Sequence, residues 1–72
     1  MEIDLRGPEG NAFALLAIAT SAARQFSYSR QTTDAITTRM RAGTYEALLD
    51  VMDDEFSGVF RFIGDPRREV AL

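Results

Sequence analysis

The stretch NAFALLAIATSAARQF, from Asn11 to Phe26, decides the fold, because no other segment of the chain is apolar enough to form the centre of a core. Asn11 is a favourable helix N-cap, since its side-chain oxygen can accept hydrogen bonds from backbone N–H groups of the first turn. We therefore predict a helix over residues 12–26. At about 100° per residue, its core-facing side holds Phe13, Leu15, Leu16, Ala19, Thr20, Ala23 and Phe26.

The opposite side of this helix is small and mostly uncharged, and it carries Ala14, Ala17, Ser21, Arg24 and Gln25. A chain of 72 residues buries only about 60% of the surface of its unfolded state. Without cysteine, no disulfide can stabilise it. A contact between copies on the small-residue side would add buried surface, so we expect a homo-oligomer.

An alternating pattern precedes this helix, with apolar Ile3 and Leu5 between charged neighbours. Such alternation is typical of a strand with one buried face, and we predict a strand over residues 2–6. Residues 7–10, GPEG, then form a turn, because proline fixes one backbone dihedral and glycine adopts conformations that other residues avoid.

Two more helices are predicted after it. Thr32 or Thr33 can cap a helix over residues 33–42. Thr44 can cap another over residues 45–56, which is the clearest amphipathic segment of the chain. Its apolar side chains recur at helical spacing: Tyr45, Leu48, Leu49, Met52 and Phe56.

The C-terminal part has the composition of a strand over residues 59–63, followed by a turn at Gly64-Asp65-Pro66. Residues 68–72 either pair back as a short third strand or fray. The sequence therefore predicts a single α+β domain over residues 1–72, in the order β-α-α-α-β(-β). We expect a small antiparallel or mixed sheet with the first and last strands adjacent and helices packed on one face.

The composition disfavours several classes of function. The chain has no histidine and no cysteine, so imidazole and thiolate metal sites are excluded and a nucleophilic enzyme would lack its usual base. We expect neither catalysis nor a cofactor. Residues 44–72 carry seven acidic and three basic side chains, and the helix predicted over residues 45–56 holds no basic residue, which argues against DNA binding.

A membrane span is not expected either. The apolar run that starts at Ala12 is broken at Thr20 and Ser21, well short of the roughly 20 residues needed to cross a bilayer. We expect a cytoplasmic protein.

The corner DLRGPEGNAF, residues 4–13, is the best candidate ligand site, because the N–H groups and the dipole at a helix start attract anions. Arg6 can add a bidentate contact to phosphate or carboxylate, and an aromatic side chain can stack on a base. The predicted site comprises Arg6, Gly10, Asn11, Phe13 and Tyr28. Glu9 opposes an anion here, and the alternative is a purely structural turn.

The predicted third helix presents an acidic side, formed by Glu46, Asp50, Asp53 and Asp54. These residues lack the alternating ligand order of a calcium-binding loop, so no metal site is expected. The acidic side is either a solvated helix surface or a face that binds a basic partner.

Two segments carry a resemblance to known proteins. IDLRGPEGNAFALL (residues 3–16) and AGTYEALLDVMDDEFSG (residues 42–58) resemble short, mostly uncharacterised proteins encoded by tailed bacteriophages and prophages. Those proteins open with a D-x-R…G-N-A-F stretch and carry an S/A-G-x-Y-x-x-L-L segment in the middle. The resemblance implies a viral accessory protein that binds a component of its host.

We therefore expect a small non-enzymatic accessory protein that binds stoichiometrically and inhibits a host defence protein, through the acidic third helix or an exposed strand edge. The alternative is an oligomeric sponge that sequesters a small anionic ligand such as a signalling nucleotide. A second alternative is a structural or assembly protein without a ligand.

Overall fold

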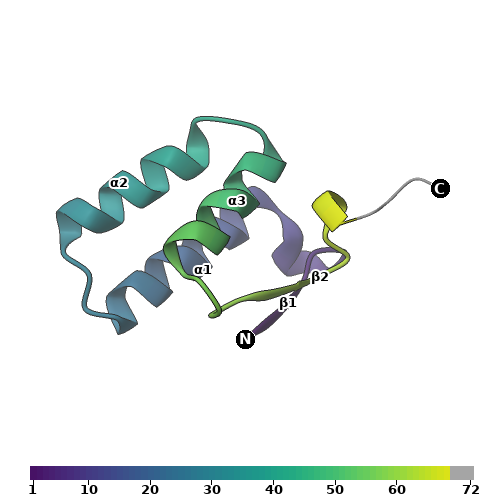
Figure 1. Ribbon diagram of the computed structural model, residues 1–72, viewed down its shortest axis with the longest axis horizontal. Coiled ribbons are helices and arrows are strands. Elements are labelled where there is room, and N and C mark those ends of the chain that lie inside the picture. Colours follow the sequence, from purple (N-terminus) through teal and green to yellow (C-terminus); the bar gives the residue numbers. More distant parts are fainter. Residues whose placement is uncertain (69–72) are drawn as a thin grey trace.

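Three helices and a two-stranded sheet make up the part of the chain that the computed structural model describes, residues 1–68 (Figure 1). The elements, in chain order, are β1 (Glu2–Asp4), η1 (Pro8–Gly10), α1 (Ala12–Gln25), α2 (Arg30–Arg41), α3 (Tyr45–Glu55), β2 (Arg61–Ile63) and η2 (Pro66–Arg68), where η marks a 3-10 helix. The predicted α+β fold class is confirmed. The third strand predicted over residues 68–72 lies outside the described residues except for Arg68, which ends η2.

The two strands pair in parallel, with Ile3 opposite Phe62. The first and last strands are adjacent, as predicted, and the antiparallel alternative for the sheet was wrong. The mixed alternative depended on the third strand, which falls outside the described residues. A parallel pair needs a long crossover connection, and the three helices between the strands supply it. Ile3 is buried while Glu2 and Asp4 are exposed, and the helices lie on one side of the sheet (Figure 1).

β1 ends two residues earlier than predicted because Asp4 starts a turn. The backbone N–H of Arg6 donates to Asp4 Oδ1 at 3.0 Å, and that of Gly7 donates to the Asp4 carbonyl at 3.1 Å. The chain therefore bends into η1 and reaches the start of α1 within a few residues.

Each helix begins at a polar cap. Asn11 and Thr44 cap α1 and α3 with their side-chain oxygens, as the sequence predicts. The expectation that Thr32 or Thr33 caps α2 was wrong: Ser29 is the cap, and its Oγ accepts from the backbone N–H of Thr32 at 3.0 Å. α2 therefore begins three residues earlier than predicted.

The core takes apolar side chains from β1, from all three helices and from Phe56, the residue that follows α3. Its buried members are Ile3, Leu15, Ala19, Ala22, Ala23, Ile36, Met40, Leu48, Leu49, Val51, Met52 and Phe56. α1 contributes mostly alanines, which let its neighbours approach closely. Large side chains of α3 fill the remaining space, so small side chains of α1 are combined with large side chains of α3 in the core.

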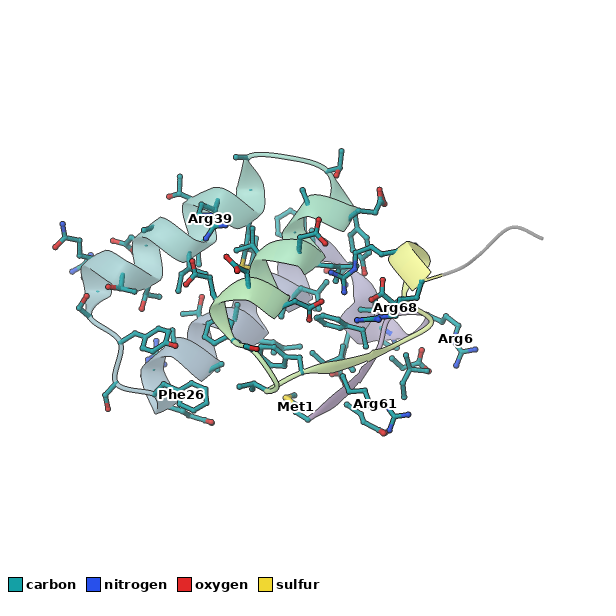
Figure 2. The ribbon with its side chains drawn as sticks, viewed as in Figure 1. Met1, Arg6, Phe26, Arg39, Arg61 and Arg68 are labelled. Carbon is teal, nitrogen blue, oxygen red and sulfur yellow. The ribbon has the colours of Figure 1, made fainter. Side chains whose placement is uncertain are left out.

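Two aromatic residues predicted to face the core do not. Phe13 is 85% exposed and Phe26 is 50% exposed, and Figure 2 shows Phe26 at the edge of the molecule. The buried stripe of α1 is centred on Leu15 and Ala19, and Phe13 precedes Leu15 by about 200° around the helix axis. Phe26 follows the last helical residue, outside the stripe.

α1 ends in a left-handed turn at Ser27, whose φ is 58°. The N–H of Tyr28 donates to the Ala23 carbonyl at 2.9 Å, and the N–H of Ser27 donates to the Arg24 carbonyl at 3.1 Å. This is the hydrogen-bond pattern of a Schellman motif. The turn holds Tyr28 stacked on Phe56, with ring centroids 5.8 Å apart, at the junction of α1 and α2.

An ion cluster ties η2 to α3. The Arg67 guanidinium lies 2.8 Å from Asp50, 2.8 Å from Asp53 and 2.6 Å from Asp65. It also lies over the ring of Phe62, 5.6 Å from the ring centroid. Only 2% of the Asp65 side chain is exposed, so the cluster is anchored on a buried carboxylate.

Candidate functional site

Arg6, the arginine expected to bind an anion, is paired with a neighbouring carboxylate. Its Nε lies 3.1 Å from Asp4 Oδ1, which also accepts from the Arg6 backbone N–H. The backbone hydrogen bond first, and then the side-chain bond, lower the pKa of the Asp4 carboxyl. The Arg6 side chain is 70% exposed, so it is half of a surface ion pair.

Gly10 and Asn11 are occupied by structural contacts. Asn11 accepts from the backbone N–H of Ala14 at 2.9 Å and donates from Nδ2 to the Pro8 carbonyl at 2.9 Å. The Gly10 carbonyl accepts from the hydroxyl of Tyr45, a residue of α3. These contacts favour the structural turn over the anion site at this corner.

The structure does not bring Tyr28 to this corner. Phe13 is the second residue of α1 and Tyr28 follows its end, so the 12 helical residues 14–25 lie between them, about 18 Å at 1.5 Å per residue. Figure 2 shows Arg6 and Phe26, the residue beside Tyr28, at opposite ends of the molecule. The five predicted site residues therefore do not form one site.

Much of the charge on the acidic side of α3 is compensated within the chain. Asp50 and Asp53 each lie 2.8 Å from Arg67, and Asp54 lies 3.6 Å from Arg39 of α2. Glu46 is the remaining predicted member, and it is exposed in the first turn of α3. A partner that needs free carboxylates here would have to break existing ion pairs.

An apolar groove opens beside Phe13, with a volume of about 550 Å³. It lies where the first half of α1 meets the α2–α3 connection, and it is lined by Ala12, Phe13, Leu16, Met40, Arg41, Gly43, Thr44, Tyr45 and Leu48. Burial, and second the charge of Asp65, raise the pKa of the Tyr45 phenol. Apolar atoms dominate this lining, and Phe13 is its most exposed large hydrophobic side chain.

Sequence reasoning missed this groove because its lining residues read as core positions. Leu48 is buried and Leu16 is half-buried, and the neighbouring α2–α3 connection contains Gly43, which adds no side chain to the groove. The one available signal was Phe13, which lies off the stripe that Leu15 and Ala19 define.

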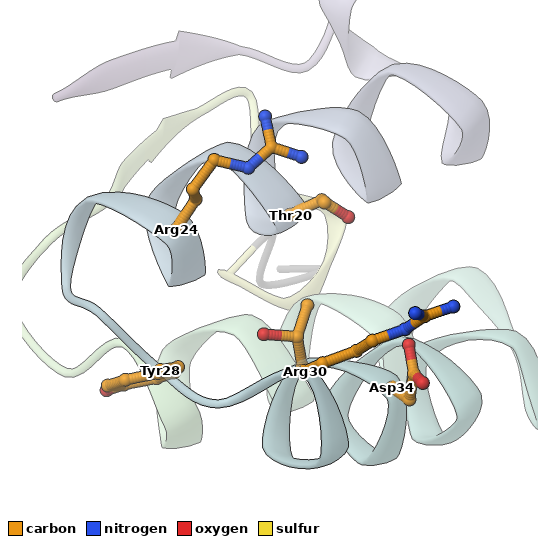
Figure 3. A pocket seen from close by; sticks show the side chains of 6 residues that line it. Thr20, Arg24, Tyr28, Arg30 and Asp34 are labelled. Atoms are coloured by element: carbon orange, nitrogen blue, oxygen red, sulfur yellow. The ribbon is translucent and has the colours of Figure 1, made fainter.

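A second hollow of about 360 Å³ lies between the later part of α1 and the start of α2 (Figure 3). Its lining residues are Thr20, Arg24, Tyr28, Arg30, Thr33 and Asp34. A third, of about 290 Å³, lies on the small-residue side of α1 and includes Met1, Ala17, Ile18, Ser21, Ala22 and Gln25. These three depressions differ in character: the first is apolar, the second contains two arginines, and the third is lined mostly by small residues.

Within residues 1–68, no group of three or more histidine, cysteine, aspartate or glutamate side chains is arranged to hold a metal ion. Among the described helices, none has the length and apolar character to span a membrane. Comparison with protein-family models, with curated proteins and with solved structures found no match to this chain.

Proposed function

We propose that this protein is a non-enzymatic phage or prophage accessory protein that binds a host protein stoichiometrically, and inhibits it, through the groove beside Phe13. The observation that carries the proposal is an aromatic side chain 85% exposed at the edge of an apolar groove. The viral origin and the cytoplasm of the host as the place of action come from the resemblance of the two sequence segments.

The energetics support this surface as a binding site. Burying a phenylalanine side chain contributes about 1.5–3 kcal/mol, and exposed aromatic residues beside pockets are typical anchors of protein interfaces. In a monomer, Phe13 forgoes that free energy. A partner that covers Phe13 and fills the groove lined by Leu16 and Leu48 would recover it.

The other two surfaces considered for a partner are less suitable. Arg67 and Arg39 already neutralise much of the acidic side of α3. Each strand of the sheet has only three residues, so a peptide added at an edge would gain few backbone hydrogen bonds. The groove is the surface that needs no prior rearrangement.

Phe13→Ser should reduce capture of the host partner roughly ten- to a hundredfold, the equivalent of the lost burial. The fold should survive because Phe13 makes little contact with the core. Immobilised wild-type and variant proteins can be compared by quantitative mass spectrometry of what they retain from host lysate.

Phe26→Ser is the matched control, because it makes the same change at the other exposed phenylalanine, 50% exposed at the far end of α1. It should retain the partner. If Phe13→Ser retains the same proteins in the same amounts as Phe26→Ser, the groove is not the binding surface.

The expected homo-oligomer is proposed to form through the small-residue side of α1. Ala17 is exposed and borders the hollow that also includes Ile18 and Ser21. Ala17→Arg should convert the oligomer to a folded monomer, as measured by size-exclusion chromatography with light scattering at micromolar concentration. A monomeric wild type would refute the oligomer. Dissociation by Phe13→Ser instead would show that a second copy, not a host protein, covers the groove.

A further inference from the structure

The hollow between α1 and α2 has two arginines in its wall. Arg24 borders it from the last turn of α1, and Arg30 borders it from the first residue of α2. In Figure 3 the Arg24 side chain extends along α1 and the Arg30 side chain extends along α2 toward Asp34. No ion pair joins either of them to a carboxylate within residues 1–68, and the same holds for Arg41, which lines the groove beside Phe13, whereas the other five arginines each have one. Two arginines without an ion pair therefore border one depression, together with the carboxylate of Asp34.

Arg30 is placed against the local electrostatic preference of its helix. The N-terminus of a helix carries partial positive charge, so a cation in its first turn is unfavourable. Ser29 already caps α2, and Arg30 is not needed for that. A residue that opposes the helix dipole in a depression with a second arginine is better explained by an anionic ligand than by stability.

The other lining residues indicate which further chemical groups the ligand carries. The ring of Tyr28 forms one wall and is held in place by stacking on Phe56 at 5.8 Å. Asp34 lies one turn after Arg30 on the same helix and also borders the hollow (Figure 3). Its carboxylate would repel a bare phosphate, but it can accept hydrogen bonds from hydroxyl or amino groups.

We infer that this hollow binds a phosphorylated small molecule that also carries hydroxyl groups, with a nucleoside monophosphate as the best-matched class. Arg24 and Arg30 bind the phosphate, Asp34 accepts from sugar hydroxyls, and Tyr28 contacts the base. The volume of about 360 Å³ is near the lower end of the range for small-ligand sites, roughly 300–1,000 Å³, which suits one nucleotide unit.

The site is separate from the proposed partner groove. Phe13 and Tyr28 lie at opposite ends of α1, so Phe13→Ser should leave nucleotide binding unchanged. An experiment that refutes binding of a host protein at the groove therefore leaves ligand binding in this hollow untested, and the reverse also holds.

The test is a titration of the full chain, followed by NMR chemical shifts and by thermal unfolding, with adenosine 5′-monophosphate, ribose 5-phosphate, inorganic phosphate and unphosphorylated adenosine. We expect the monophosphate to bind most tightly, adenosine not to bind, and the melting temperature to rise by several degrees at saturation. Arg24→Gln and Arg30→Gln should each weaken binding roughly ten- to a hundredfold. Arg30→Gln should not lower the melting temperature of the free protein.

Two further variants make the test specific. Arg6→Gln removes another exposed arginine, which lies outside the hollow, and should bind like wild type. Asp34→Asn should strengthen binding of inorganic phosphate while reducing the preference for ribose 5-phosphate. The inference is overturned if the folded protein shows no response to any phosphate compound at millimolar concentration, if adenosine binds as well as its monophosphate, or if Arg6→Gln rather than Arg24→Gln abolishes binding.

Discussion

Gly10→Ala is expected to cause a severe loss of stability. A Cβ atom at Gly10 would lie 1.9 Å from the carbonyl oxygen of Leu5 and 2.4 Å from its carbonyl carbon. Neither backbone segment can move freely, because the Leu5 N–H donates to Ile63 in the sheet at 2.9 Å and the Gly10 carbonyl accepts from Tyr45. Relief of the clash would separate β1 from α1.

The expected cost is roughly 4 kcal/mol or more, the range of severe backbone and packing disruptions. A domain of this size has a total stability of about 4–11 kcal/mol, so the variant would unfold at the lower end of that range and would lose roughly a third or more of its stability at the upper end. Far-ultraviolet circular dichroism during heating measures the effect. Gly7→Ala is the control: its Cβ would meet Asp4 at an ordinary 3.5 Å. A Gly10→Ala protein that melts within a few degrees of Gly7→Ala would contradict this packing.

Asp65→Ala should have the second largest effect on stability. The Asp65 side chain is 2% exposed and lies 2.6 Å from Arg67. Removing one partner of a buried ion pair costs about 3–5 kcal/mol, and we expect the lower end because the Arg67 side chain is 15% exposed. At about 4–8 °C per kcal/mol for a small domain, the melting temperature should fall by roughly 10 °C or more.

Glu2→Ala is the matched control for this variant, because Glu2 pairs with Arg61 at 3.4 Å while both side chains are mostly exposed. Exposed pairs contribute about 0–1 kcal/mol. Similar melting temperatures for Asp65→Ala and Glu2→Ala would show that the cluster around Arg67 does not hold η2 to α3.

The same carboxylate predicts a pH dependence of stability. Hydrogen bonds from the Arg67 side chain, ahead of its other contacts, lower the pKa of Asp65 in the folded state. The unfolded state therefore binds more protons as the pH falls through the usual aspartate pKa of about 3.9, and the free energy of unfolding decreases. Its stabilisation is complete above that pH and is lost below it. In urea titrations, Asp65→Ala should show a shallower acid limb than wild type.

The local features of this fold could be predicted from the sequence. Asn11 and Thr44 are caps that act within their own first turn, and the period of α3 follows from its side chains alone. The predicted helix ends were displaced where two nearby residues compete for the same role, as Ser29 and Thr32 do at α2.

Features that depend on how the helices pack could not be predicted in the same way. The helical pattern places apolar side chains on both sides of Leu15 around the helix axis. The packing of the neighbouring helices decides which of these sides is buried, and so the prediction that Phe13 faces the core was wrong. The hollow with Arg24 and Arg30 exists only because the turn at Ser27 brings α2 back against α1. The ion cluster at Arg67 likewise joins residues that are far apart in the chain.

The most direct measurement of the proposed function is photocrosslinking from position 13 in living host cells, with a photoreactive phenylalanine analogue in place of Phe13 or, as control, of Phe26. From position 13 we predict one dominant covalent adduct between this chain and a single host protein, with one copy of each chain. From position 26 we predict little adduct. No adduct from position 13, an adduct only between copies of this chain, or the same adducts from both positions would contradict binding of a host protein through the groove.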